Sequence, residues 1–146
     1  MCYVNNPIIK KAENKDEIKK AIQIRKIVFI KGQNVPVDIE IDGLDFRATH
    51  FIMYLHDEPI GCARIRFNKY AKLERIAIIE QYRGKGFGKK LTKFLIDYCK
   101  NNGFHQIVIH SQIQVVDFYK KLGFKVRGKP FLEADIEHLE MCLDHS

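Results

Sequence analysis

A glycine-rich, basic segment in the middle of the chain constrains the fold more than any other feature. It reads Arg83-Gly84-Lys85-Gly86-Phe87-Gly88-Lys89 and lies between a strand-like run at 72–79 and a helical pattern that begins at Gly86. The first N–H groups of a helix have no intrahelical partner, and the helix dipole is positive there. Glycines let the backbone approach a phosphate closely, and the three cations add charge. The segment therefore predicts an anion-binding loop at a strand-to-helix junction.

Three known phosphate loops compete for this segment. A Walker A loop needs Ser or Thr where Lys90 stands, and it needs an earlier glycine that is missing here. A dinucleotide fingerprint would place its last glycine at Lys89. The pattern [Q/R]-x-x-G-x-[G/A] is met by Arg83, Gly86 and Gly88. This third pattern is that of the pyrophosphate loop of acetyl-CoA-dependent transferases, and we favour it.

The rest of the chain predicts an α/β (α+β) fold in one domain, residues 1–146. Strand and helix patterns alternate with turn residues, and the acidic stretch 33–47 reads as irregular, with room for a short helix. Strands are expected at 7–11, 50–55, 60–67, 72–79, 104–110, 124–127 and 138–143, and helices at 14–32, 86–102 and 115–122. Because strand, helix and strand follow one another around Gly86, we expect one parallel crossover in an otherwise antiparallel sheet.

Composition narrows the range of partners and surroundings. The formal net charge of +7 favours anionic partners, either nucleic acid or a phosphorylated small molecule. No apolar run could cross a bilayer and no signal peptide is evident, so we expect a cytoplasmic protein without a membrane partner. The histidines lack ligand spacing, so we expect no metal. The cysteines are scattered and read as reduced thiols: Cys2, Cys62, Cys99 and Cys142.

A second motif strengthens the transferase interpretation. Gln112 is followed by Phe118-Tyr119-Lys120-Lys121-Leu122-Gly123-Phe124, which is similar to the N-x-x-A-x-x-x-Y-x-x-x-G-F element of the GNAT acetyltransferases, with Gln in place of Asn. Further residues resemble the small ElaA/YjcF-type subgroup. They are Arg25, Val28, Phe29, Gln33, Asp42 and Asp45 in the N-terminal half, and Gly128, Phe131, Glu133, Ile136, His138 and Met141 in the C-terminal half.

The GNAT resemblance implies a single domain with a mixed, mostly antiparallel sheet of six to seven strands, flanked by about four helices. It also implies acetyl-CoA as cosubstrate and allows a homodimer. Strand residues 76–78 would pair with the pantetheine arm, the glycine-rich loop would hold the pyrophosphate, and Tyr119 would lie near the thioester sulfur. The cofactor residues implied are Ile76, Ala77, Ile78, Arg83, Gly84, Lys85, Gly86, Phe87, Gly88, Lys89, Gln112 and Tyr119.

Acetyl transfer to an amine needs a base for the amine and a donor for the leaving thiolate. We expect Tyr119 to be the acid, although Val115, Tyr119 and Leu122 share a helix face and a core role is the alternative. Glu74 is the candidate base, with an ion pair as the competing interpretation. His110 could also reach the cleft, since it ends the strand before Gln112.

The acceptor is expected to be a primary amine on a small molecule, attacking directly in a ternary complex. Basic side chains such as Arg25 and Arg64 would suit a phosphorylated amino sugar such as glucosamine 6-phosphate, and Glu133 and His138 could bind the acceptor or move protons. Three alternatives stay open. They are a protein or peptide acetyltransferase, a nucleic-acid-binding module, which we favour less because no such motif is present, and a CoA sensor.

Overall fold

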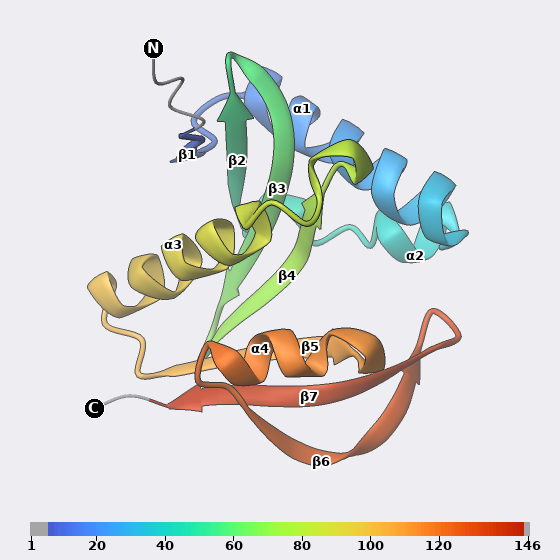
Figure 1. Cartoon of the computed structure of the whole chain (residues 1–146), viewed down its shortest axis with the longest axis vertical. Coiled ribbons are helices and arrows are strands. Elements are labelled where there is room, and N and C mark those ends of the chain that lie inside the picture. Colours follow the sequence, from blue (N-terminus) through green and yellow to red (C-terminus); the bar gives the residue numbers. More distant parts are fainter. Residues whose placement is uncertain (1–5, 145–146) are drawn as a thin grey trace.

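A twisted sheet of seven strands lies at the centre of the computed structural model, which describes residues 6–144 (Figure 1). The strand order is β1-β2-β3-β4-β5-β7-β6. The strands are β1 Ile8–Lys11, β2 Thr49–Leu55, β3 Glu58–Phe67, β4 Ala71–Ile78, β5 Gln106–Gln112, β6 Lys125–Glu133 and β7 Ile136–Asp144. Four α-helices accompany them in this part of the chain: α1 Lys15–Arg25, α2 Val37–Glu40, α3 Phe87–Asn101 and α4 Val116–Lys121. The predicted α/β fold class is confirmed.

The strands β2, β3 and β4 form the predicted antiparallel meander, and their side chains alternate between two cores. Phe51 and Met53 of β2 face the larger core with α3, whereas Ile52 faces a smaller core with Ala21 and Ile24 of α1. The helices α1 and α3 therefore lie on opposite sides of these strands (Figure 1). Alternation with period two is the pattern of a strand that is buried on both faces.

The first helix begins as predicted at Asn14, whose side-chain oxygen accepts the N–H of Glu17 at 2.9 Å. The Glu17 carboxylate accepts the N–H of Glu13 at 3.1 Å, so the reciprocal bond of a capping box goes to the residue before the cap. After Arg25 the helix continues as a π-helical segment, Lys26–Lys31, and Gly32 is the C-cap of this segment. Val28 and Phe29 of this segment pack against the smaller core.

The strands β4 and β5 pair in parallel only at one end, and this opens the sheet. The pairing joins Ala71–Leu73 to Ile107–Ile109 and extends no further. Beyond it β4 carries a bulge, where Arg75 has a φ of 56°. A bulge bends its strand and increases the local twist. The two strands consequently diverge, and α3 connects β4 to β5 as the predicted crossover (Figure 1).

The strand β6 is longer than the predicted 124–127. Gly128, with a φ of 88°, accommodates a register break between Arg127 and Phe131, after which pairing with β7 resumes up to Glu133. The prediction ended the strand early because Gly-Lys-Pro is typical of a turn. The resumed pairing places the tip of the β6–β7 hairpin beside the opening between β4 and β5.

Two further observations concern the surroundings of the fold. No helix within residues 6–144 is long and apolar enough to cross a membrane. Cys62, Cys99 and Cys142 are free thiols, whereas Cys2 lies outside the described residues.

Candidate active site

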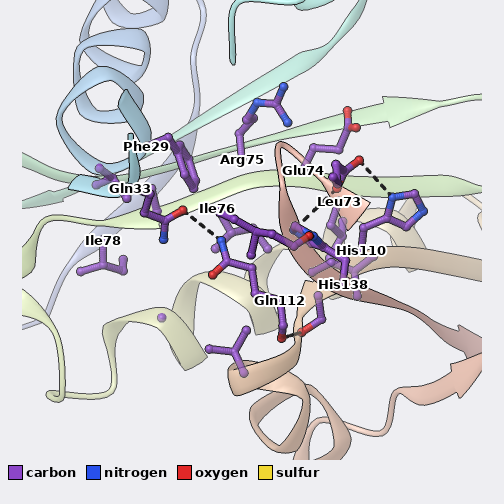
Figure 2. Close-up of a pocket in the computed structure, with 18 of the residues that line it drawn as sticks. Phe29, Gln33, Leu73, Glu74, Arg75, Ile76, Ile78, His110, Gln112 and His138 are labelled. Atoms are coloured by element: carbon purple, nitrogen blue, oxygen red, sulfur yellow. Dashed lines mark hydrogen bonds and ion pairs between the residues drawn. The ribbon is translucent and has the colours of Figure 1, made fainter. Parts of the chain in front are cut away.

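A pocket of about 810 Å³ occupies the opening between β4 and β5 (Figure 2). It extends from the glycine-rich loop, past the diverging strands, to the tip of the β6–β7 hairpin, and residues 28–42 form one wall. Predicted site residues that line it are Glu74, Ile76, Ala77, Ile78, Arg83, Gly84, Gly86, Gly88, Lys89, Gln112, Tyr119, Glu133 and His138. The fold thus brings together most of the residues that the sequence singled out.

The loop end of the pocket is suited to an anion. Gly84 and Gly86 have φ values of 76° and 85°, a backbone conformation that is strained for a residue with a side chain. The helix α3 begins directly afterwards. No side chain caps this helix, so the N–H groups of residues 87–89 lack partners from the helix itself. Arg83 donates from Nε to the carbonyl of Ile78 at 2.8 Å, which ties the loop to the end of β4.

Two residues predicted to contact a cofactor do not present their side chains to the pocket. The Phe87 side chain is buried in the core with Leu91 and Leu95, so only its N–H group faces the loop end. The Lys85 ammonium lies 5.8 Å from the centre of the Tyr82 ring, outside the pocket lining. Lys85 and Phe87 belong to the loop motif in sequence. Successive side chains of such a turn point to different sides, so not all of them can face the pocket.

A row of glutamines crosses the middle of the pocket. Gln112 donates to the Gln33 side-chain oxygen at 2.9 Å and accepts from Gln114 at 2.7 Å (Figure 2). Gln33 follows the π-helical segment and Gln112 ends β5, so this contact joins two segments that are distant in sequence. In Figure 2 the bond lies between Ile78 and the end of the pocket that holds His110 and His138.

Tyr119 lines the pocket from α4 while most of its ring is buried. Its ring meets Phe118 and Phe124 edge to face, with centroid distances of 5.0 and 5.8 Å. Burial raises the pKa of the Tyr119 hydroxyl above its ordinary value, so the hydroxyl keeps its proton at neutral pH. The two expectations for Tyr119, core aromatic and pocket residue, are therefore compatible.

Glu133 and two histidines form an acid–base cluster at the far end of the pocket. Glu133 lies 3.5 Å from His110 Nδ1 and 3.7 Å from His138 Nε2. His138 Nδ1 donates to the carbonyl of Ile136 at 2.7 Å, which leaves Nε2 as the nitrogen that can accept a proton. The bond with His110 lowers the pKa of Glu133. On its other side, His110 Nε2 lies 3.2 Å from Glu140.

Comparison with known proteins decides the family. Residues 38–145 match the family model described as Acetyltransferase (GNAT) domain. The chain belongs to the GNAT acetyltransferases. It is 38% identical over 135 residues to the uncharacterised N-acetyltransferase YjcF of Bacillus subtilis, covering 91% of this chain and 96% of YjcF. The protein is accordingly an acyltransferase, as predicted from the two motifs.

Two solved structures share the fold of this acetyltransferase. Escherichia coli ElaA superposes with a TM-score of 0.87 at 22% identity, covering 95% of this chain and 100% of ElaA. A GNAT acetyltransferase from Elizabethkingia anophelis, crystallised with acetyl-CoA, superposes with a TM-score of 0.76 at 18% identity, covering 97% and 99% of the two chains. The predicted resemblance to ElaA and YjcF is confirmed.

The acetyltransferase holds Glu74 in ion pairs. The Glu74 carboxylate lies 2.5 Å from Arg66 Nε, 3.1 Å from Arg64 Nε and 3.4 Å from Lys72 Nζ. Its side chain is only 9% exposed, and the pKa of Glu74 is lowered to about 2 because these cations outweigh the opposing effect of burial. These contacts match the ion-pair interpretation and make Glu74 a weak base.

Arg25 and Arg64, expected to bind the acceptor, are buried away from the pocket, and the structure does not support that role. Their side chains are 1% and 0% exposed, and neither lines the pocket. Arg25 pairs with Glu40 at 2.5 Å and Asp45 at 2.6 Å, while Arg64 pairs with Asp42 at 2.6 Å and Asp45 at 2.8 Å. Carboxylates from the acidic stretch 33–47 therefore neutralise the charges that sequence reasoning had assigned to a phosphate.

The pocket also contains residues that sequence reasoning did not assign to it. Arg75 lines it from the β4 bulge and Gln33 from another wall (Figure 2), and Lys72 lines it from the paired end of β4. The only sequence feature that singled out Gln33 was the similarity of its segment to the ElaA/YjcF subgroup. A positive φ at an arginine carries no sequence signal, because glycine or asparagine is the usual marker of that conformation. Within residues 6–144 no three His, Cys, Asp or Glu side chains form a group that could hold a metal.

Proposed function

We propose that this acetyltransferase moves the acetyl group of acetyl-CoA to the primary amine of a small molecule, by direct attack in a ternary complex. One observation carries the proposal. The uncapped start of α3 and the cluster of Glu133, His110 and His138 lie at the two ends of one pocket, with Tyr119 along its wall. A single continuous pocket can hold both substrates together, and this proximity is a large part of catalysis in bimolecular transfer.

In this proposal the diphosphate of acetyl-CoA lies against the N–H groups of 87–89, with Arg83 and Lys89 beside it. The pantetheine arm extends along residues 76–78, whose strand has left the β5 ladder. The Elizabethkingia structure, which shares the fold, has acetyl-CoA bound, and this supports the same cosubstrate here. Tyr119, which keeps its proton at neutral pH, donates to the departing thiolate.

We assign the base to the far end of the pocket instead of to Glu74. The ion pairs of Glu74 stabilise its ionised form, so it has little tendency to take a proton. Glu133 attracts the ammonium form of the acceptor, and His138 Nε2 removes the proton before attack. The Ile136 carbonyl holds the imidazole in the tautomer that this step needs.

The phosphorylated amino sugar predicted from the sequence loses its main support in this arrangement. That hypothesis depended on Arg25 and Arg64, which do not line the pocket and whose charges are neutralised by ion pairs with carboxylates. The small-molecule amine is retained as the acceptor class. The homodimer and the cytoplasmic location stay predictions.

Calorimetry with acetyl-CoA, followed by an acceptor screen that measures release of free thiol, tests the proposal. We expect micromolar binding of acetyl-CoA and amine-dependent thiol release. Lys89→Ala should weaken binding of acetyl-CoA, whereas Lys100→Ala, at the opposite end of α3, should leave it unchanged. If the purified protein takes up no CoA or acetyl-CoA at millimolar concentration, the proposal is wrong.

A further inference from the structure

The cations at the acceptor end of the pocket all have carboxylate partners. Arg66 pairs with Glu74 at 2.5 Å and Lys72 pairs with it at 3.4 Å. Arg75 pairs with Glu40 at 2.7 Å and lies 3.3 Å from Asp42. Among the described residues that line this end, none therefore offers an unpaired guanidinium or ammonium group to an anion. A phosphate or carboxylate on the acceptor would have to displace one of these partners, at the cost of leaving a buried charge alone.

Glu133 is the exception among the carboxylates of the pocket. Its side chain is 46% exposed, and its ion-pair partners are the histidines His110 and His138, at 3.5 and 3.7 Å. Both rings are backed by Phe131, with centroid distances of 4.9 and 5.9 Å. A cationic amine that enters the pocket thus meets one accessible carboxylate beside aromatic surfaces.

The wall formed by residues 28–42, which also carries Gln33, Glu40 and Asp42, has an apolar part. That part is formed by Val28, Phe29, Val35 and Ile39, which come from the π-helical segment and from the loop and short helix that follow it. Ile39 is exposed at the rim, while Val28 and Val35 are buried. Figure 2 shows Phe29 beside Gln33, with its ring directed toward Ile76 of β4. An apolar surface of this kind favours binding of an apolar part of a ligand, because that part is then removed from water.

From these three features we infer that the acceptor is a primary amine on an apolar body that carries no anionic group. The inference rests on the proposed function and deepens it by naming the class of acceptor. The amine is drawn to Glu133, the apolar body lies against Val35 and Ile39, and the paired cations give no binding energy to a carboxylate or phosphate.

Two matched pairs of acceptors test this inference with the full-length protein and acetyl-CoA. 2-Phenylethylamine and phenylalanine differ by a carboxylate alone, and glucosamine and glucosamine 6-phosphate differ by a phosphate alone. We expect kcat/KM to be roughly 10-fold or more higher for 2-phenylethylamine than for phenylalanine, because the site would leave the carboxylate unpaired. The phosphate should lower kcat/KM in the second pair, and 2-phenylethylamine should exceed both sugars.

Substitutions at the rim of the pocket distinguish contact between the acceptor and the apolar wall from a general loss of activity. Ile39→Asn should lower kcat/KM for 2-phenylethylamine by about 10-fold while changing that for methylamine much less. Val37→Asn is the matched control, since Val37 is exposed on the same short helix but does not line the pocket, and it should act like wild type. Glu133→Gln should raise KM for both amines.

The outcomes distinguish this inference from the proposed function. If acetyl-CoA binds but phenylalanine or glucosamine 6-phosphate is the better member of its pair, the inference is overturned and the cofactor assignment stands. The same holds if 2-phenylethylamine is not acetylated, or if Ile39→Asn lowers turnover of both amines equally. If acetyl-CoA does not bind, the proposed function itself is wrong, and the inference about the acceptor is wrong with it.

Discussion

At the scale of the residue, Tyr119 carries the sharpest prediction about the chemistry. Its hydroxyl is proposed to donate to the thiolate of CoA, and burial keeps it protonated. Tyr119→Phe removes the donor and preserves the ring packing with Phe118 and Phe124. We expect kcat to fall roughly 100-fold, as is typical of a lost proton donor, while the Kd of acetyl-CoA stays within a factor of two.

Tyr98→Phe is the matched control for this variant. This variant loses the same hydroxyl, but the Tyr98 ring packs against Phe51 and Phe67 and does not line the pocket. Its steady-state rates should equal those of wild type. A Tyr119→Phe enzyme that turns over as fast as Tyr98→Phe would remove Tyr119 from the mechanism and leave it as a packing residue.

Sequence reasoning identified single residues where local spacing carries the information, and it failed where distant partners decide. Tyr119 and Gln112 follow a motif within one short stretch, and both line the pocket. Arg25 and Arg64 are different, because the carboxylates of the acidic stretch 33–47 that pair with them are 15 to 22 positions away in the chain. Nothing in a one-dimensional pattern specifies that those acids fold back onto these two arginines instead of facing solvent.

At the scale of the element, we expect a substitution in the glycine-rich loop to weaken cofactor binding more than its effect on stability alone would explain. Gly86 has a φ of 85° with open space around its Cα, so Gly86→Ala strains the backbone without a clash. We expect a loss of about 1 kcal/mol in the free energy of unfolding. The same strain distorts the N–H groups that are proposed to bind the diphosphate, so the Kd of acetyl-CoA should rise by roughly 10-fold or more.

Gly103→Ala provides the control at the other end of the same helix. Gly103 has a φ of 83° and equally open surroundings, so the cost in stability should match that of Gly86→Ala. Chemical denaturation and calorimetry on both variants measure the two quantities. Equal weakening of acetyl-CoA binding in the two variants would mean that the loop acts only through global stability.

The order of strands and helices was predictable because each element has its own periodicity and its own terminating glycine or cap. The interruptions inside strands were not predictable in the same way. The bulge at Arg75 and the register break after Arg127 depend on how a strand pairs with its neighbours, which is a property of the sheet. The bulge matters most for function, since it helps to open the space between β4 and β5 that becomes the pocket.

At the scale of the whole molecule, a layer of ion pairs fastens the acidic stretch 33–47 to the sheet. Each member pairs with at least one residue of opposite charge, and the members are Arg25, Glu40, Arg75, Asp42, Asp45, Arg64, Glu74, Arg66 and Lys72. Buried ion pairs add little net stability by themselves, but removing one partner is costly because the other is left uncompensated. The layer therefore fixes the apolar wall of the pocket relative to β4.

This layer predicts how stability depends on pH. The pKa of Glu74 is about 2 in the folded protein and near 4.5 in the unfolded chain, and the pKa values of Asp42 and Asp45 are also lowered. A lowered pKa means that folding favours the ionised form, so the stabilisation is complete above pH 5 and is lost as the pH falls toward 2. For Glu74 the full loss is on the order of 3 kcal/mol. Urea unfolding between pH 3 and pH 7 measures the larger part of this loss.

Glu74→Gln removes one titrating member of the layer and should flatten this dependence. The variant should be less stable than wild type at pH 7, because three cations lose a charged partner, and the difference should shrink as the pH falls toward 3. Asp38→Asn, which changes an exposed carboxylate on α2 outside the layer, should keep the wild-type slope. If Glu74→Gln and wild type lose stability in parallel from pH 7 to pH 3, the layer does not hold the acidic stretch on the sheet through Glu74.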